Sequence, residues 1–333
     1  QGRVSEISRA SNGDIDVLTL ETGEQISGDF FVDCTGFAAV LMQKTLGVPF
    51  NSFKDNLFND SAVVMPTPVT ENVPVETVSK ALSAGWCWKI PLVNRFGNGY
   101  VYSSGFISSE QAEAEFRQHL IEEAQSSGQP TLGIEGEALQ ESECRHLKMR
   151  VGQLASHWSH NCLALGLSQG FIEPLEATAL HLVQISVEMF CIKFEEGKFG
   201  PEKRGEFNGD ITRRFDHVRD YIVAHYKLNT REDSEYWKAN RDNKHLSESL
   251  LQILDVWYRR GDVSAELARQ KLQTHFGTNS WHCLLAGYGA FPPLAPDQPG
   301  KGDRYIEAGV QPFLEGCALN YGTLKENLSR FDT

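Results

Sequence analysis

Short apolar runs broken by turn-forming residues dominate the first part of the chain. Near the N-terminus, the runs at residues 4–7 and 15–22 flank Ser-Asn-Gly-Asp at residues 11–14. Asn-Gly between two such runs is a strong signal for a β-hairpin. The apolar triplet at residues 30–32 then precedes Asp33 directly. This pattern predicts a hairpin followed by a short buried strand that ends at Asp33.

Strand and helix patterns alternate through the middle of the chain, whereas only helical patterns follow residue 195. Gly and Pro separate the strand-like runs, and the helical stretches carry apolar residues at helical spacing. We predict strands at residues 63–65, 87–92, 100–104 and 162–167, helices at residues 110–126, 174–193, 216–226, 247–258 and 265–276, and a loop at residues 287–300. The sequence therefore predicts an α/β core followed by a mostly helical C-terminal region.

Composition narrows the classes of function. The 333 residues include 44 acidic and 31 basic side chains, a net charge of −13, and 41% are hydrophobic. This acidic balance excludes a nucleic-acid partner, which would require clustered Lys and Arg. No apolar run approaches the roughly 18 residues of a membrane span. Seven scattered cysteines without a Cys-x-x-Cys pair fit free thiols, so we expect a cytoplasmic protein.

The strongest candidate for chemistry is the stretch from Gly166 to Ala179. A buried strand pattern leads into a glycine-rich turn, and Pro174 is placed to open a helix, as proline often does. The unpaired N–H groups and the dipole at a helix start attract anions such as phosphate, carboxylate or halide. Glu176 in the expected first turn is either a general base beside a bound anion or a complement to the dipole. An ordinary capped turn remains the alternative.

Three other patterns carry weaker signals. Asp33-Cys34-Thr35-Gly36 at a strand end fits either a cofactor crevice of an α/β sheet or a structural turn. Trp86 and Trp88 share one strand face, which usually means packing. The spacings His157-x-x-His160 and Glu143-x-x-His146 are ligand-like, but the second lacks the partner copy that a di-iron site needs, and both are more typical of surface or hydrogen-bonded histidines. We therefore predict no metal site.

Taken together, three segments resemble the flavin-dependent halogenases, the family of the tryptophan halogenases. They are Gly-Asp-Phe-Phe-Val-Asp-Cys-Thr-Gly-Phe at residues 28–37, Trp-x-Trp-x-Ile-Pro at residues 86–91, and Phe-x-Glu-Pro-Leu-Glu-x-Thr at residues 171–178. The Trp-x-Trp-x-Ile-Pro motif distinguishes this family from flavin monooxygenases of the same fold. The resemblance is firm over about residues 16–190.

The resemblance implies an α/β fold of the FAD-binding flavoprotein monooxygenase type, N-terminally incomplete, with a β-rich substrate sheet. The expected segments are a partial FAD-binding module at 1–40, the substrate-side sheet and helices at 41–155, a return to the FAD-binding module with the halide and catalytic helix at 156–195, and a helical C-terminal region at 196–333. The family's G-x-G-x-x-G turn and catalytic lysine are expected before residue 1, since Lys44, Lys89 and Lys148 lie in the wrong segments.

The resemblance also implies a reaction. FAD reduced by a separate flavin reductase, together with oxygen and chloride or bromide, yields hypohalous acid, which halogenates an electron-rich aromatic ring of the indole or pyrrole type. The implied residues are Glu176 as the catalytic residue, Asp33, Cys34, Thr35, Gly36, Leu167 and Leu180 at the cofactor, the backbone of Thr178 and Ala179 at the halide, and Trp86, Trp88 and Pro91 as a gate beside the flavin.

One departure from the family pattern concerns the residues after Glu176. Tryptophan-specific members usually continue with Ser-Thr-Gly, whereas this chain has Ala177-Thr178-Ala179. Backbone donors survive this change, but residues that grip free tryptophan are not recognisable. The alternatives are an FAD-dependent aromatic monooxygenase and a non-catalytic, truncated remnant of the fold. A homodimer would follow family habit.

Overall fold

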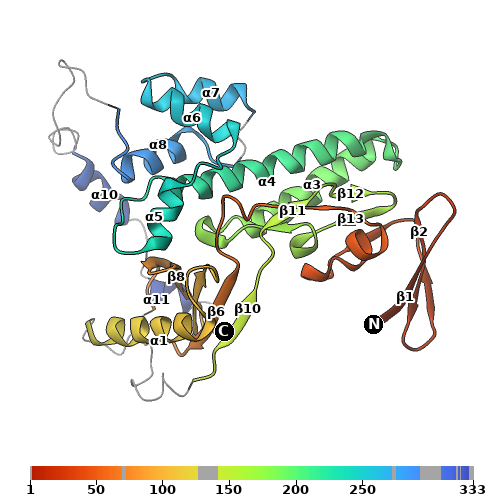
Figure 1. Ribbon diagram of the computed structural model, residues 1–333, viewed down its shortest axis with the longest axis horizontal. Helices are drawn as coiled ribbons and strands as arrows, with labels where there is room; N and C mark the ends of the chain where they lie inside the picture. The colour runs from red at the N-terminus through yellow and green to blue at the C-terminus, as the bar shows by residue number, and fades with distance from the viewer. Residues whose placement is uncertain are drawn as a thin grey trace.

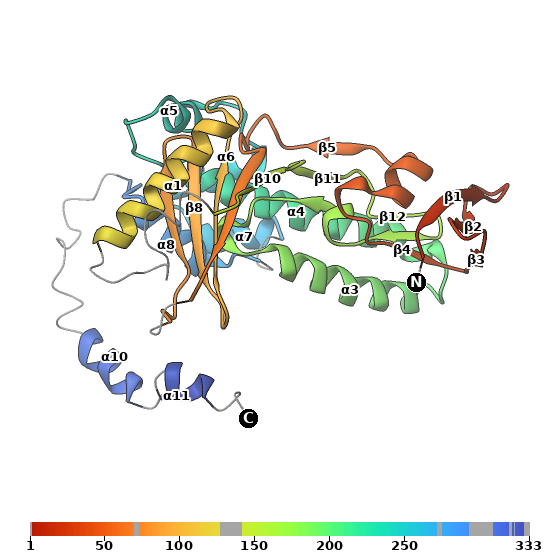
Figure 2. The same cartoon turned by 90° about the horizontal axis from the view of Figure 1, so that it is seen from below.

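The structure is a computed structural model that describes residues 2–69, 73–126, 142–271, 275–292, 309–319, 322 and 324–329. Helix α4 (Arg204–Lys227) runs across the middle of an elongated molecule (Figure 1). The N-terminal hairpin lies at one end, and a lobe of sheet and shorter helices lies at the other (Figures 1 and 2).

The predicted N-terminal hairpin is confirmed. Strands β1 (Val4–Arg9) and β2 (Ile15–Leu20) pair antiparallel around the Asn-Gly turn, and β3 (Gln25–Ser27) extends the sheet. Gly13 has a φ of 92°, a left-handed conformation that glycine adopts without strain. The Asn12 side chain accepts a hydrogen bond from the Asp14 backbone at 3.0 Å, which tightens the turn.

A five-stranded antiparallel sheet forms the centre of the lobe. Its strands, in sheet order, are β10 (Arg145–Lys148), β6 (Ser61–Thr67), β9 (Phe96–Tyr102), β8 (Gly85–Pro91) and β7 (Val78–Leu82). Helix α1 (Ser109–Ser126) covers one face, where Tyr100 and Phe116 are fully buried. Figure 2 shows α1 on this face. The strands predicted at 63–65, 87–92 and 100–104 and the helix at 110–126 are all present within one to four residues.

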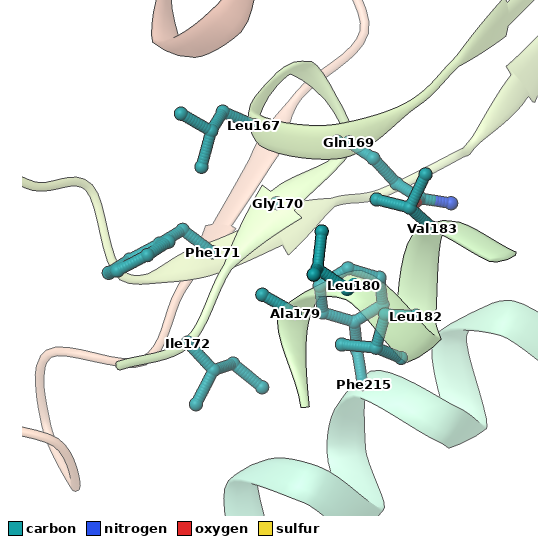
Figure 3. Close-up of a pocket in the computed structure, with 11 residues that line it drawn as sticks. Leu167, Gln169, Gly170, Phe171, Ile172, Ala179, Leu180, Leu182, Val183 and Phe215 are labelled. Carbon is teal, nitrogen blue, oxygen red and sulfur yellow. The ribbon is translucent and has the colours of Figure 1, made fainter. Parts of the chain in front are cut away.

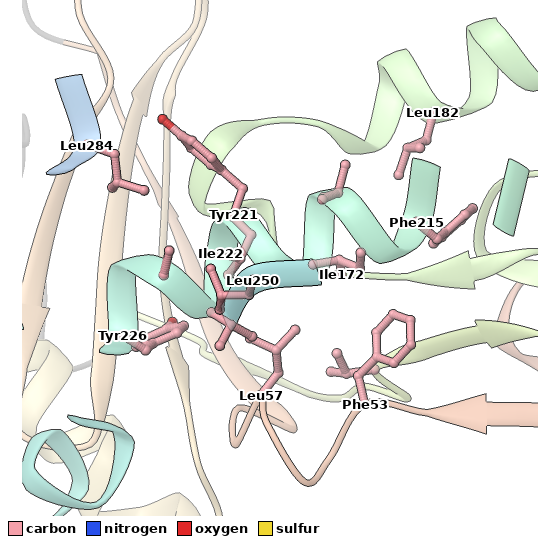
Figure 4. Close-up of a cluster of buried hydrophobic side chains, with 14 of the residues drawn as sticks. Phe53, Leu57, Ile172, Leu182, Phe215, Tyr221, Ile222, Tyr226, Leu250 and Leu284 are labelled. Atoms are coloured by element: carbon pink, nitrogen blue, oxygen red, sulfur yellow. The ribbon is translucent and has the colours of Figure 1, made fainter. Parts of the chain in front are cut away.

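The opposite face of the sheet packs against the long helices. Helix α3 (Ala179–Glu196) lies beside α4, and one large cluster joins sheet residues to α3, α4 and the C-terminal helices. Figure 4 shows Leu182 of α3 and Phe215 of α4 in this cluster, together with Ile172. Each fully buried side chain of this size contributes about 1.5–3 kcal/mol to folding. This core fixes the segment before α3 relative to the sheet.

Two small sheets connect the hairpin to the helices. One contains β12 (Trp158–Ser159), β13 (Cys162–Ala164) and β4 (Phe31–Asp33), and the other contains β14 (Gly170–Phe171), β11 (Gly152–Leu154) and β5 (Phe50–Ser52). Strand β13 is shorter than the run predicted at 162–167. The chain turns at Gly166 with a φ of 63° and continues as a single 3₁₀ turn at Gly166–Ser168.

The C-terminal region is helical where it is described. The helices are α5 (Glu235–Asp242), α6 (Glu248–Tyr258), α7 (Val263–Arg269), α8 (Thr278–Gly287), α10 (Val310–Ala318) and α11 (Leu324–Leu328). Ser234, Ser247 and Asp262 cap the first three of these helices through side-chain oxygens. The helix predicted at 265–276 is wrong in its extent, because it ends at Arg269 and Lys271 has a φ of 59°. Residues 293–300 of the predicted loop lie outside the described residues.

Two further findings concern the described chain as a whole. None of its helices has the combination of length and apolar character that crossing a bilayer requires. Six cysteines are free thiols, as the sequence predicts: Cys34, Cys87, Cys144, Cys162, Cys191 and Cys283.

Candidate active site

The ends of two parallel strands bring two predicted segments together. Strands β4 and β13 pair in parallel, with Asp33 opposite Ala164, so the turns that follow them leave the same edge of the sheet. The Ser168 hydroxyl joins these turns, since it lies 3.1 Å from Asp33 Oδ1 and 3.1 Å from the Gly36 carbonyl oxygen. The two turns therefore form one edge of the sheet, although about 130 residues separate them in sequence. This edge contains Asp33, Gly36 and Leu167, the residue next to Ser168.

Groups of the protein itself form hydrogen bonds with both oxygens of the Asp33 carboxylate. The residue is fully buried, and Oδ2 accepts the backbone N–H groups of Leu41 and Met42 at 2.9 Å each. Oδ1 accepts the Thr35 N–H at 3.0 Å and the Thr35 hydroxyl at 2.6 Å. This geometry makes Asp33 a positioning residue for the turn. Cys34 and Thr35 are exposed and Gly36 is half-buried, so these three members of the motif remain accessible to a ligand, although the Thr35 hydroxyl is hydrogen-bonded within the turn.

Replacing Asp33 by asparagine tests this positioning role. The amide of asparagine keeps one acceptor oxygen, but its NH2 group is a donor. Depending on the orientation of the amide, this donor points at the N–H groups of Leu41 and Met42 or at that of Thr35. Because buried donors are left unpaired, we expect the free energy of unfolding to fall by about 3 kcal/mol. Chemical denaturation measures this change. Asp29→Asn, at an exposed position, is the control; an equal loss in both variants would contradict the assignment.

The segment before α3 differs from the prediction. The helix expected from Pro174 begins at Ala179, because Pro174–Glu176 forms a single 3₁₀ turn. Ala177 ends that turn with a φ of 52° and donates its N–H to the Pro174 carbonyl at 3.0 Å. The left-handed residue redirects the chain, so Glu176 is not in the first turn of α3. The start of the α3 dipole lies instead at Thr178 and Ala179.

The start of α3 fits an anion. The first N–H groups of an α-helix have no acceptor within the helix, and α3 is 18 residues long. Thr178, the residue that precedes the helix, is 6% exposed. Its hydroxyl oxygen is buried without a hydrogen-bond partner. An unpaired buried hydroxyl is costly unless a ligand or water completes it. Thr178 and Ala179, the predicted halide residues, therefore form a chemically suitable site.

An apolar pocket of about 210 Å³ lies beside this helix start. Leu167 and Leu180 both line it, and Figure 3 shows Leu167 on one side of the Gly170–Phe171 strand and Leu180, in the first turn of α3, on the other. Leu180 is 84% exposed and Leu167 is 43% exposed. Exposed apolar side chains around a pocket indicate a binding surface. The structure thus brings together the predicted cofactor-lining residues and Ala179.

A second pocket, of about 380 Å³, lies on the other side of the same segment. Its lining residues come from β7, β8, α4, α5, the 3₁₀ turn and the end of α8: Ser79, Lys80, Ala81, Trp86, Leu175, Glu176, His225, Tyr226, Trp237 and Tyr288. The Glu176 side chain is 34% exposed there, and its Oε1 lies 2.8 Å from His225 Nε2. Residues 172–180 therefore contribute to both pockets, with Ile172 and Ala179 on one and Glu176 on the other.

The two tryptophans share one face of β8, as predicted, with ring centroids 5.9 Å apart. Trp86 is 3% exposed and lines the Glu176 pocket. Trp88 lies over Gly99, where an added Cβ would meet its ring at 2.1 Å. In the described part of the chain, the pocket of Leu167 and Leu180 includes neither tryptophan nor Pro91, the last residue of β8. Their role as a gate beside the flavin stays a prediction.

Sequence reasoning gave no role to Glu173, which the structure places in a buried polar network. The residue is fully buried, and its Oε2 accepts hydrogen bonds from Trp86 Nε1 at 3.1 Å and from the Asn59 amide. The Asn59 amide also bonds the Tyr226 hydroxyl at 2.9 Å. Burial raises the pKa of Glu173 to about 7, although the hydrogen bonds from Asn59 and Trp86 oppose this. The only sequence signal is that Glu173 directly follows the apolar pair Phe171-Ile172.

Sequence reasoning also did not consider Lys80, although it borders the Glu176 pocket. In the β7–β8 pair, Lys80 lies opposite Cys87, whose side chain is buried on the α1 face. The charge of Lys80 also contributes to lowering the pKa of His119 on α1, which burial mainly lowers. Strand alternation therefore directs this lysine away from Glu176. Lys89, which the sequence places in the wrong segment for the catalytic lysine, forms an ion pair with α1, with its Nζ 3.1 Å from Glu123 Oε1.

The histidine pairs singled out in the sequence have structural partners. His157 is fully buried and stacks on Phe215, and its Nε2 donates a hydrogen bond to Gln153 Oε1 at 3.1 Å. Burial lowers the pKa of His157 to about 3. His146 lies 2.7 Å from Glu113. Among the described residues, no three His, Cys, Asp or Glu side chains are grouped as a metal site would require.

Comparison with known proteins is decisive for the family. A family model described as tryptophan halogenase matches residues 1–298. The chain belongs to the tryptophan halogenase family. It is 36% identical over 244 residues to the 7-chloro-L-tryptophan 6-halogenase KtzR of Kutzneria sp. (strain 744), covering 72% of this chain and 44% of KtzR. It is 37% identical over 244 residues to the tryptophan 6-halogenase SttH of Streptomyces toxytricini, covering 72% of this chain and 43% of SttH.

Solved structures of the family confirm the fold. The SttH crystal structure matches with a TM-score of 0.80 at 31% identity, over 94% of this chain and 59% of that chain. BrvH, a flavin-dependent halogenase from Brevundimonas sp. BAL3, matches with a TM-score of 0.76 at 30% identity, over 93% and 59%. The predicted resemblance and the α/β flavoprotein-type fold are thus confirmed. The chain spans less than half the length of the first curated relatives it matches.

Proposed function

We propose that the chain carries the halide-binding and substrate-binding parts of a flavin-dependent halogenase that acts on an electron-rich aromatic ring of the indole or pyrrole type. The observation that supports this most directly is the position of residues 172–180 between two pockets. One pocket adjoins a helix start suited to an anion. The other holds a carboxylate among aromatic side chains. This arrangement separates the oxidation of a halide from the substitution of a ring.

On the first side, the backbone N–H groups of Thr178 and Ala179 hold chloride or bromide. Leu167 and Leu180 line the flavin, with Cys34, Thr35 and Gly36 at the neighbouring edge. FAD, reduced by a separate flavin reductase, supplies the electrons with which oxygen is activated and the halide is oxidised to hypohalous acid. The apolar lining of this pocket limits the access of bulk water.

On the second side, Glu176 accepts the proton that the ring loses when it is substituted. Trp86, Tyr226 and Trp237 give this pocket flat aromatic walls against which an indole or pyrrole can stack. Trp86 is also part of the barrier that keeps the organic substrate away from the flavin, with Trp88 and Pro91 further along β8. A homodimer is consistent with this proposal and is not required by it.

The direct test measures bromide incorporation. The chain is incubated with indole or pyrrole, bromide, FAD, NADH and a flavin reductase, alone and with an added N-terminal segment of SttH. Mass spectrometry then detects the bromine isotope doublet in the product. We expect the doublet in at least one of the two samples. Its absence from both, while SttH brominates tryptophan under the same conditions, would contradict the proposal.

Replacing Ala179 by aspartate tests the halide site with two effects of opposite sign. A carboxylate at the start of α3 complements the dipole and should raise the free energy of unfolding by about 0.5 kcal/mol. It should also repel a bound halide, so chloride affinity should fall at least about tenfold. Chlorine NMR line broadening and thermal unfolding measure the two effects. Ala179→Asn is the neutral control, and unchanged chloride binding in Ala179→Asp would place the anion elsewhere.

A further inference from the structure

A histidine from α4 and a tyrosine from the end of α8 lie behind Glu176. His225 Nε2 is 2.8 Å from Glu176 Oε1, and the approach lies off the ideal direction of a hydrogen bond. On the other side of the ring, His225 Nδ1 is 3.2 Å from the Tyr288 hydroxyl. The three side chains therefore form a line from the pocket into the helical region. Neither His225 nor Tyr288 belongs to a sequence motif that predicted the site.

The His225 ring is fixed by its surroundings. Its side chain is 17% exposed, and two aromatic rings contact it edge-on, Tyr221 at a centroid distance of 5.4 Å and Tyr288 at 5.7 Å. The Tyr221 hydroxyl donates to the Ser280 carbonyl at 3.0 Å, so this tyrosine packs on the ring without bonding its nitrogen atoms. Tyr288 alone of the two can therefore determine which ring nitrogen carries the proton.

The chemistry of Tyr288 indicates the tautomer. Burial, with a smaller contribution from the charge of Glu176, raises the pKa of Tyr288 above its ordinary value. The phenol is thus protonated at neutral pH and can donate to Nδ1. Because the Glu176 carboxylate beside Nε2 can only accept, Nδ1 is the ring nitrogen that accepts from Tyr288. In the neutral ring the proton is then on Nε2, the nitrogen that lies 2.8 Å from Glu176 Oε1. His225 also lies in the last turn of α4, where the helix dipole favours a donor or a cation.

We infer that His225 is a positioning residue that holds the Glu176 carboxylate toward the aromatic pocket, and that Tyr288 sets the tautomer with which it does so. This inference rests on the proposed role of Glu176. A base must lie within hydrogen-bond reach of the proton that it removes. Glu176 is on an irregular turn whose neighbour Ala177 is left-handed, so the turn alone fixes its side chain poorly. A contact from the rigid helix α4 supplies the missing constraint.

The first experiment needs no substrate or cofactor. Heteronuclear NMR of the labelled chain reports which ring nitrogen of His225 carries the proton, and the signal is assigned by its loss in His225→Gln. We expect protonated Nε2 and unprotonated Nδ1 at neutral pH, a mixture of tautomers in Tyr288→Phe, and no change in Tyr221→Phe. Glu176→Gln should shift the Nε2 signal. Protonated Nδ1 in the wild type, or an unaffected tautomer in Tyr288→Phe, would overturn the inference.

The second experiment follows bromination in the sample that shows wild-type turnover. His225→Leu should lower kcat roughly tenfold with KM for the aromatic substrate nearly unchanged, since the base is misplaced and the pocket walls remain. His225→Gln should recover most of the lost kcat, because the glutamine amide can donate a hydrogen bond as Nε2 does. Equal turnover of wild type and His225→Leu would overturn the inference. If the wild type itself gives no product, the proposed function fails, while the NMR experiment still decides the contact.

Discussion

Replacing Glu176 by glutamine should lower halogenation at least about 100-fold, because a positioned general base contributes roughly 10²–10⁴ to the rate of such a step. The amide has nearly the shape of the carboxylate but cannot accept the proton of the substituted ring. Flavin retention should change little, since Glu176 lines the pocket opposite that of Leu167 and Leu180. Brominated product per unit time and flavin retained on the protein are the two measurements.

The control for this prediction is Glu188→Gln. Glu188 is exposed on α3, and its carboxylate contacts only Gln184 of the same helix among the described hydrogen bonds. The variant should halogenate at the wild-type rate. Wild-type turnover in Glu176→Gln would remove Glu176 from the reaction, whereas loss of flavin in that variant would show that the two pockets are not separate.

The second large effect concerns stability and involves Glu173. Its pKa of about 7 in the folded protein lies above the ordinary value of 4.5, because burial disfavours the charged form. The folded state therefore holds this proton more tightly than the unfolded state does. The stability that the protonated form provides is complete below about pH 4.5 and is lost as the pH rises through 7. The expected loss between these limits is about 3 kcal/mol.

Glu173→Gln should remove this part of the pH dependence. Glutamine imitates the neutral acid and can still accept hydrogen bonds from Trp86 and Asn59. We expect the variant to be close to wild type in stability at pH 5 and about 2–3 kcal/mol more stable at pH 8. Urea denaturation at the two pH values measures the difference. Glu195→Gln, exposed on α3, should keep the wild-type pH dependence; equal slopes in wild type and Glu173→Gln would contradict the prediction.

Local signals in the sequence predicted elements better than they predicted how those elements meet. Residues close together in sequence determine each of these elements: the Asn-Gly turn, the alternating strand β8 and the helical spacing of α1. The start of α3 was misplaced because Pro174 does open a helical turn, whereas nothing in the sequence announces that Ala177 adopts a left-handed conformation. Such a conformation is held by the surrounding structure rather than by the residue itself.

The candidate site shows the same division. Glu176 and Thr178 are predicted because they belong to the motif at residues 171–178, and Leu167 and Leu180 because the family resemblance implies them. His225 and Tyr288 were missed because their approach to Glu176 depends on the packing of α4 and α8, which lie about 50 and 110 residues further along the chain. Glu173 belongs to the motif at residues 171–178, but its role depends on burial against Trp86 and Asn59, and burial at a single position is not visible in a sequence.

The wall shared by the two pockets has a consequence for altering the specificity of this protein. Residues 172–180 border both pockets, so under the proposed function a substitution in this segment that widens the choice of aromatic ring would also disturb the choice between chloride and bromide. The two properties are uncoupled elsewhere, at Ser79 and Ala81 of the edge strand β7, which border only the Glu176 pocket. An engineer who seeks new substrates should vary that strand, and one who seeks a new halogen should begin with the residues around Leu167.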